Sequence, residues 1–435
     1  MNVIALRLYK RPLFLKVVEW IKLISITGSS QLLIQAIGLL SGILIIRLLP
    51  TQEYGFYTLA NTMLGTMVVL ADCGISNSVL AQGGKVWQDK QKLGVVLATG
   101  FDLRKKFAIV ALLITIPVLI YLLIHHHASW LTSILIAASI IPAFLMVLSG
   151  NLLSVGPALH QSIVPVQKVQ VGVSLGRIVL LTSTIFFFPW ACLAILAAGL
   201  PQIWGNLKLR KISSDYANWS QKPDPEIQRN ILNVVKRILP GSIYYCLSGQ
   251  IVIWIIAVFG TTAAVAQIGA LGRLSMVLNL LSAVFGVLIV PRFARLIKND
   301  GLVLKRFLQI QLGLVTLFIG VVLLVSLFPT QVLWILGKSY SSLGKELVLS
   351  VAGSCVSMLA GLLFTLSTSR NWIINPLISI PLTILAIIVA ILLINISSLA
   401  GVLKFNLFVS AVEVLIYFSY CLIKIFSEKQ EVAKA

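Results

Sequence analysis

The stretch AAVAQIGALGRLSMVLNLLSAVFGVLIV, residues 263–290, is mostly apolar and contains one charged side chain, Arg273. At about 1.5 Å per helical residue, a stretch of this length crosses the roughly 30 Å hydrocarbon core of a bilayer. A charge at the centre of a spanning helix costs about 2.5 to 3.5 kcal/mol, so Arg273 needs a partner that compensates it. We therefore predict a membrane-spanning helix that contains a functional cation.

Apolar runs of similar length recur along the whole chain. It has 435 residues, of which 58% are hydrophobic and 11% charged, whereas about 25% are charged in average proteins. We predict an all-α polytopic membrane protein with about twelve spans, which makes most classes of aqueous enzyme improbable. The expected spans are residues 25–47, 56–80, 107–124, 130–153, 169–188, 190–206, 239–259, 264–290, 307–328, 346–368, 372–394 and 399–423.

The basic residues follow an alternating pattern between these spans. Most lie before the first span and in every second loop after it, whereas the other loops hold little beyond Arg47, Lys338 and Lys345. The positive-inside rule then places both termini in the cytoplasm. The net charge of +21 reflects topology and attraction to anionic lipids, so we expect no nucleic-acid partner.

A hydrophilic segment, residues 208–237, divides the chain into two halves of six expected spans. Such a division is typical of transporters built from internal repeats. The predicted parts are an amphipathic cytoplasmic segment 1–22, an N-lobe 23–207, the inter-lobe loop 208–237, a C-lobe 238–424 and a cytoplasmic tail 425–435.

Few ionisable residues fall inside the spans, and the cations outnumber the acids. A carrier of acidic ligands needs cations to offset the negative charge of its desolvated substrate, whereas a cation-coupled exporter needs buried carboxylates. We predict an anionic substrate bound by Arg273 with help from Arg177 and Arg47. Asp72 and Glu413 are candidates either for pairing with an arginine or for binding a coupling cation.

Catalytic signatures are missing from the sequence. It has no phosphate-binding glycine loop and no HExxH, and its five cysteines lie in separate apolar segments. We therefore predict no catalytic residues, no metal site, no cofactor and no enzyme activity.

Two junctions resemble a known family. RLLPTQEYGFY at 47–57, preceded by GLLSG at 38–42 and followed by LADCGI at 70–75, resembles the first-to-second helix region of polysaccharide and O-antigen flippases of the Wzx and PST type. QIGALGRL at 267–274 and VPRF at 290–293 are similar to the eighth helix of that family, although its usual Gly-x-Tyr before the arginine reads Ala266-Gln267-Ile268 here. These flippases belong to the multidrug/oligosaccharidyl-lipid/polysaccharide (MOP) exporter superfamily.

The resemblance implies two six-helix lobes, as in MATE and other MOP transporters, that alternate between inward and outward access. It implies a polyprenyl-diphosphate-linked oligosaccharide, a polysaccharide or lipopolysaccharide repeat unit, as the substrate in the cytoplasmic membrane, with Arg273 on the diphosphate. Membrane lipids and a glycan polymerase or export machinery are the implied partners. Two alternatives stay open: a cation-coupled multidrug antiporter that uses Asp72 or Glu413, and a polytopic glycan polymerase or ligase.

Overall fold

The computed structural model describes residues 12–279, 281–282, 285, 289–290, 293, 302–370, 372 and 374–434, and all regular structure in these ranges is helical. The chain is an all-α polytopic membrane protein. Residues 1–11 of the expected amphipathic segment, and Pro291 and Arg292 of the quoted motif, lie outside the described residues.

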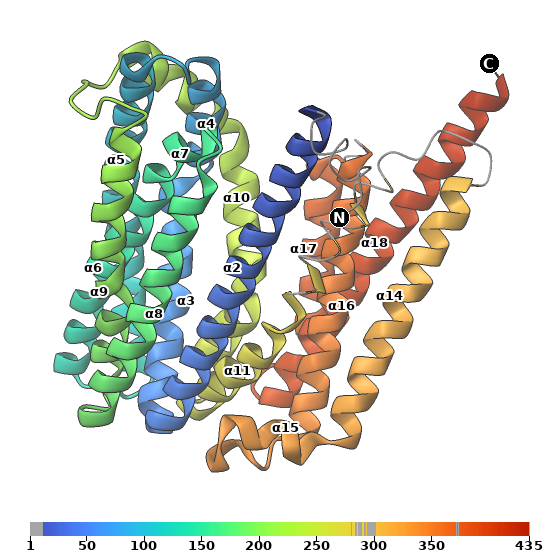
Figure 1. The fold of residues 1–435 in the computed structure, drawn as a ribbon. Helices are drawn as coiled ribbons and strands as arrows, with labels where there is room; N and C mark the ends of the chain where they lie inside the picture. The colour runs from blue at the N-terminus through green and yellow to red at the C-terminus, as the bar shows by residue number, and fades with distance from the viewer. Residues whose placement is uncertain are drawn as a thin grey trace, which may run out of the picture. The chain divides into compact units, whose positions relative to one another are not determined.

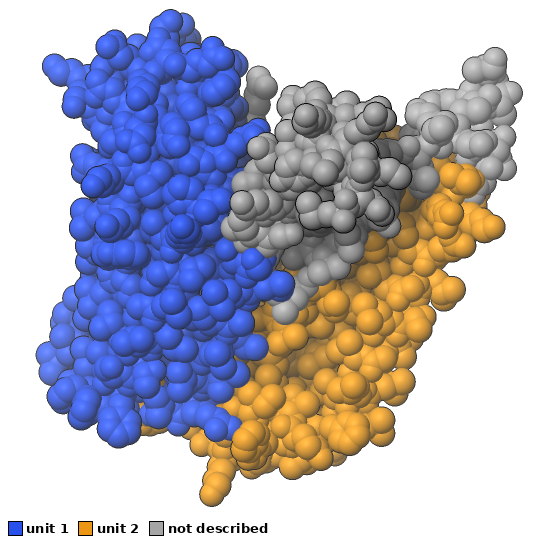
Figure 2. Space-filling model, in the orientation of Figure 1, with its two compact units in different colours: residues 1–48, 60–246 blue, residues 49–59, 247–435 orange. Residues whose placement is uncertain are grey.

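The chain divides into two compact units, coloured separately in Figure 2. Unit 1 contains residues 1–48 and 60–246, and unit 2 contains residues 49–59 and 247–435. The later boundary between the units thus lies near residue 246. A short piece, residues 49–59, groups with unit 2 although it comes early in the chain.

The helices of the first half are drawn in Figure 1 from blue to yellow-green. Those with the closest packing within unit 1 are α6 with α9, α8 with α9 and α2 with α8. Their bounds are α2 (Pro12–Leu48), α3 (Thr51–Asp72), α4 (Ile75–Lys85), α5 (Lys90–His125), α6 (Trp130–Leu153), α7 (Val155–Leu159), α8 (Ile163–Phe187), α9 (Ala191–Ser214) and α10 (Pro225–Phe259).

The second half, from yellow to red, contains six further α-helices among the described residues. In unit 2, α16 packs against α18, α14 and α11. The bounds are α11 (Thr262–Ser275), α14 (Leu302–Leu327), α15 (Pro329–Leu336), the short 3₁₀ helix η1 (Lys338–Tyr340), α16 (Gly344–Ser369), α17 (Pro376–Leu393) and α18 (Leu399–Lys434).

Eight helices in the described residues are long and apolar enough to cross a membrane, and the bent pair α3 and α4 makes a ninth. Helices α10, α11 and α17 overlap in sequence with the other three expected spans. Large apolar side chains remain exposed on their surfaces, such as Leu113 at 71% and Leu392 at 78%. Such exposure suits contact with lipid.

Several helices extend beyond the expected spans. Helix α2 begins at Pro12, so residues 12–22 continue into the first span without a break. Helix α5 begins at Lys90, well before the expected start at residue 107, because Asp89 caps it by accepting hydrogen bonds from the N–H groups of Gln91 and Lys92.

The inter-lobe loop is much shorter than the hydrophilic composition of residues 208–237 suggested. Helix α9 continues to Ser214 and α10 begins at Pro225, which leaves residues 215–224 as the connection. The Asn218 N–H donates to the Lys90 carbonyl at 2.9 Å, and the Asp224 N–H donates to Thr99 Oγ1 at 2.9 Å. The loop is therefore fixed against α5.

Candidate functional site

Arg273 lies in the last turn of α11. This helix begins after Thr261, whose hydroxyl accepts a hydrogen bond from the Ala264 N–H at 3.2 Å, and it ends at Ser275. The expected span 264–290 is therefore interrupted by a turn at residues 276–277. A cation near a helix C-terminus interacts favourably with the helix dipole. Broken helices with exposed backbone groups are common at the substrate sites of transporters.

Two tyrosines from the start of α3 belong to the same unit and surround Arg273. Tyr54 and Tyr57 are 1% and 2% exposed, and their rings stack with centroids 6.1 Å apart. The Arg273 guanidinium interacts electrostatically with both phenol groups. The Tyr57 hydroxyl is buried and has no well-formed hydrogen bond within the described residues. The phenols thus form a polar but uncharged environment for the cation.

Glycines allow the first turns of α3 to approach α11 closely. A Cβ at Gly55 would lie 2.9 Å from the Thr262 carbonyl oxygen, and one at Gly269 would lie 2.5 Å from Thr58 Oγ1. Small residues at helix interfaces let backbones approach in membranes. These two contacts hold Tyr54 and Tyr57 beside the helix that carries Arg273.

A third tyrosine, Tyr340, approaches this cluster from η1, outside the spans. It is 2% exposed and interacts electrostatically with Tyr54. Burial raises the pKa of Tyr340 above its usual value, and the neighbouring Tyr54 acts in the same direction. Tyr340 therefore stays protonated and neutral.

The positive charge of Arg273 is not neutralised by the described part of the chain. No described Asp or Glu oxygen lies within 4.0 Å of it, and its Nη1 contacts the Met276 sulfur at 3.8 Å. Two residues on, the Ser275 hydroxyl is 2.7 Å from the Ser354 hydroxyl of α16. The result is a half-buried cation among neutral polar groups, an arrangement that favours a bound anion.

The other two predicted cations lie in unit 1. Arg47 is exposed in the last turn of α2. Arg177 is half-buried in α8, and its Nε is buried without a hydrogen-bond partner among the described residues. The two residues thus differ: Arg47 is exposed at the end of its helix, whereas Arg177 carries a buried donor without a described partner.

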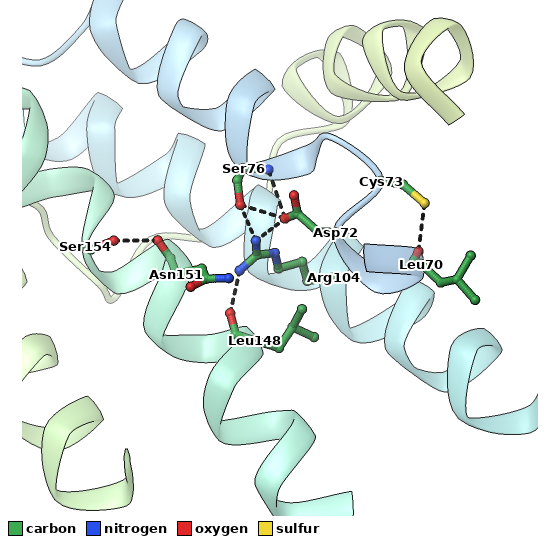
Figure 3. A network of polar contacts seen from close by, with 8 residues as sticks. All are labelled: Leu70, Asp72, Cys73, Ser76, Arg104, Leu148, Asn151 and Ser154. Carbon is green, nitrogen blue, oxygen red and sulfur yellow. Dashed lines mark hydrogen bonds and ion pairs between the residues drawn. The ribbon is translucent and has the colours of Figure 1, made fainter. Parts of the chain in front are cut away.

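Asp72 is held in a polar network at the bend between α3 and α4 (Figure 3). Cys73 and Gly74 adopt positive φ angles of 38° and 84°, and the two helices meet at 41°. Asp72 Oδ1 accepts hydrogen bonds from the Ser76 N–H at 3.2 Å and the Ser76 hydroxyl at 2.6 Å. It also forms an ion pair with Arg104 of α5.

Arg104 is 2% exposed and completes this network. Its guanidinium donates to Asp72, to the Ser76 hydroxyl and to the Leu148 carbonyl of α6 (Figure 3). In the sequence, Arg104 opens an Arg-Lys-Lys run directly before the expected span 107–124, and a run of this kind is typical of a basic loop. The charge of Asp72 inside a span was the signal that an arginine partner had to lie nearby.

A cavity of about 250 Å³ adjoins this network in unit 1. It contains one carboxylate, Asp72, which is already paired, and two amides, Asn77 and Asn151. Such a lining suits hydroxyl groups better than a free cation. The lining residues are Val68, Val69, Asp72, Cys73, Gly74, Asn77 and Asn151.

Glu413, the second acidic candidate, is half-buried in α18. It forms no salt bridge with the residues that the structure describes. The described residues also contain no group of three or more His, Cys, Asp or Glu side chains arranged to hold a metal ion.

The fold is similar to those of solved membrane transporters. A multidrug-resistance MATE family transporter of the MOP superfamily, in an inward-facing conformation, matches 91% of this chain and 96% of its own, with 14% identity and a TM-score of 0.71. The lipid II flippase MurJ, in an inward-closed conformation, matches 92% of this chain and 88% of its own, with 11% identity and a TM-score of 0.69.

A MATE transporter from Vibrio cholerae aligns over 95% of this chain and 96% of its own, at 14% identity and a TM-score of 0.54. No protein-family model and no curated protein sequence matches the chain. At these identities the similarity establishes the fold, and the expectation of a MATE/MOP-like helical architecture is confirmed: the chain has the fold of MOP-superfamily transporters and flippases.

Proposed function

We propose that this protein is a flippase that moves a polyprenyl-diphosphate-linked oligosaccharide across the cytoplasmic membrane by alternating access of its two units. Transporters and a lipid flippase of similar fold support the class. The choice of an anionic lipid-linked substrate rests on the charges of this chain.

The observation that carries the proposal is the environment of Arg273. Its charge has no described carboxylate within salt-bridge distance, and buried phenols surround it. A diphosphate offers several anionic oxygens, and a guanidinium binds such groups through two parallel charge-assisted hydrogen bonds. A diphosphate would thus supply the charge compensation that Arg273 lacks.

The remaining predicted cations have supporting roles in this proposal. We expect Arg177 and Arg47 to assist with the diphosphate, and the Nε of Arg177 is buried without a hydrogen-bond partner among the described residues. The glycan passes through the polar interior while the polyprenyl chain stays in the bilayer. A polymerase or export complex then takes the unit on the outer side.

The test compares three variants in cells that depend on this protein for surface glycan. Arg273→Ala should abolish glycan export and cause a lipid-linked oligosaccharide to accumulate, without reducing the amount of protein in the membrane. Arg273→Lys should restore export only partly, because lysine keeps the charge but loses the two-pronged geometry. Arg306→Ala is the control, since Arg306 is exposed and bonds only Gln309 at 3.0 Å among the described residues.

A cation-coupled multidrug antiporter is the second candidate, and Glu413 is the observation in its favour. Glu413 is half-buried without a described salt-bridge partner, whereas Asp72 is already paired with Arg104. Drug resistance in an exporter-deficient host that is lost in Glu413→Gln, but kept in Arg273→Ala, would replace the flippase proposal with this one.

A further inference from the structure

A separate cavity of about 550 Å³ lies in unit 1, between α5, α6, α9 and the inter-lobe loop 215–224. It shares no lining residue with the cavity beside Asp72. The side chains around it combine a basic part with a broad apolar wall. They are Ala98, Phe101, Asp102, Lys105, Met146, Ser149, Leu153, Ile203, Asn206, Leu207, Arg210, Trp219 and Pro223.

The charge of the cavity is positive. Lys105 and Arg210 are exposed, and neither forms a salt bridge within the described residues. Asp102, the acidic residue of the lining, is paired with Lys106 at 2.7 Å. Two cations are therefore available to an anionic group.

The apolar wall is open rather than packed. Leu207 is 65% exposed and Ile203 is 38% exposed, on the same helix as Arg210. Trp219 closes the other side with its ring edge-on to Phe101, at a centroid distance of 5.4 Å. The Trp219 indole N–H is buried and has no acceptor among the described residues, so a donor also remains unused at this side.

The cavity lies at the boundary of the apolar spans. Lys105 comes two residues before the expected span 107–124, and Arg210 follows the expected span 190–206 by four residues. By the positive-inside rule this is the cytoplasmic boundary, where anionic headgroups attract Lys and Arg. The basic side chains thus lie at the depth of a lipid headgroup, and the apolar wall lies at the depth of the first part of an acyl chain.

We propose that this cavity binds an anionic phospholipid of the cytoplasmic leaflet. Lys105 and Arg210 hold its phosphate, and an acyl chain lies along Leu207 and Ile203. The site is independent of the transported substrate. Because the loop 215–224 is fixed on α5 beside it, the bound lipid stabilises the packing of this loop within unit 1.

The test uses the full chain in nanodiscs of phosphatidylcholine doped with phosphatidylglycerol. The protein is released in native mass spectrometry and the retained lipids are counted. The Lys105→Gln/Arg210→Gln variant should retain phosphatidylglycerol on the order of tenfold less than the wild type, because it removes both charges that hold the phosphate. The control is Lys208→Gln/Lys211→Gln, which removes the same charge from α9 outside the cavity lining.

A second variant, Leu207→Asn, tests the acyl-chain wall without changing charge, and it should also reduce retention. Equal retention by the cavity variant and the wild type would overturn the proposal. So would equal loss in both charge variants, because binding would then follow net charge alone. If inorganic phosphate displaces the lipid and Leu207→Asn retains as much lipid as the wild type, the cavity binds a soluble anion. That result would contradict the proposal.

Discussion

Arg104 and Arg273 are both arginines in apolar surroundings, but their partners differ. Arg104 is paired with Asp72 and also bonds Ser76 and the Leu148 carbonyl, so both of its Nη groups are used within the protein, while its Nε has no partner among the described residues. Arg273 has neutral phenols and a thioether sulfur beside it. We therefore propose a structural role for Arg104 and a substrate-binding role for Arg273.

Removing either member of the Asp72–Arg104 pair should destabilise the protein. Breaking a buried ion pair leaves one charge uncompensated and typically costs about 3 kcal/mol. Asp72→Asn and Arg104→Met should each lower the melting temperature in detergent, and the double variant should lose less than the sum of the two. Additive losses in this double-mutant cycle would show that the pair does not couple the α3–α4 bend to α5.

The sequence pointed to Asp72 and Arg273 because a charge in an apolar run is visible without a structure. It did not point to Arg104 as a partner, since Arg104 stands next to Lys105 and Lys106 and looks like part of a basic loop. In the sequence, Tyr54 and Tyr57 stand out only as part of the 47–57 motif. Their role depends on residues more than two hundred positions away, which no local pattern contains.

At the level of helices, the approach of α3 to α11 depends on Gly55. A Cβ there would meet the backbone of Thr262, which cannot move like a side-chain end. Gly55→Ala should therefore destabilise the protein by roughly 1 to 3 kcal/mol and also impair export, because it displaces Tyr54 and Tyr57. Gly272→Ala is the matched control on α11, since its Cβ would meet nothing within 4 Å. Thermal unfolding that is equally affected in both variants would contradict this account.

The start of α5 should respond to acid. Hydrogen bonds from the Lys92 and Gln91 N–H groups, of which the Lys92 bond is the larger cause, lower the pKa of Asp89 below its usual value. Partial desolvation of the carboxylate opposes this shift without reversing it. Its stabilising effect is present above the unfolded-state pKa and is lost as the pH falls through the lower, folded-state pKa.

Hydrogen exchange measures this effect at the Gln91 and Lys92 amides. In the wild type, exchange corrected for intrinsic rates should increase at strongly acidic pH. Asp89→Asn should keep the cap but lose this increase, because asparagine caps without titrating. In Asp89→Ala, the Gln91 and Lys92 amides should exchange fast at every pH. An unchanged acid response in Asp89→Asn would show that another group titrates there.

Hydropathy predicted where helices cross the membrane better than where they begin, end or bend. A span predicted from hydropathy ends where charged residues begin, whereas helices such as α5 and α9 continue past these residues in hydrogen-bonded turns. The break after Asp72 requires positive φ angles at Cys73 and Gly74, and only the glycine hinted at it. The break after Ser275 lies in a continuous apolar run, so the sequence offered no local sign of it.

For the whole molecule, composition and the spacing of apolar runs were sufficient to predict an all-α polytopic membrane protein, whereas the MOP-like fold was predicted from the resemblance of two junctions to flippases of that superfamily. The twelve expected spans and the central division follow from the chain length and from hydropathy, which are read from all residues together. The substrate depends instead on a few side chains from distant elements, and its chemistry is therefore argued from Arg273 and its neighbours.

The most direct test of the central claim is transport in proteoliposomes that contain only this protein and a polyprenyl-diphosphate oligosaccharide with a reducible fluorophore on the glycan. A membrane-impermeant reductant destroys the signal of any molecule exposed outside. We predict that the wild type and Arg306→Ala bring the inner pool to the outside, while Arg273→Ala slows this by about tenfold or more, as expected for losing a charge-assisted hydrogen-bonded contact. Transport by Arg273→Ala at the wild-type rate, or none by the wild type, would contradict the account.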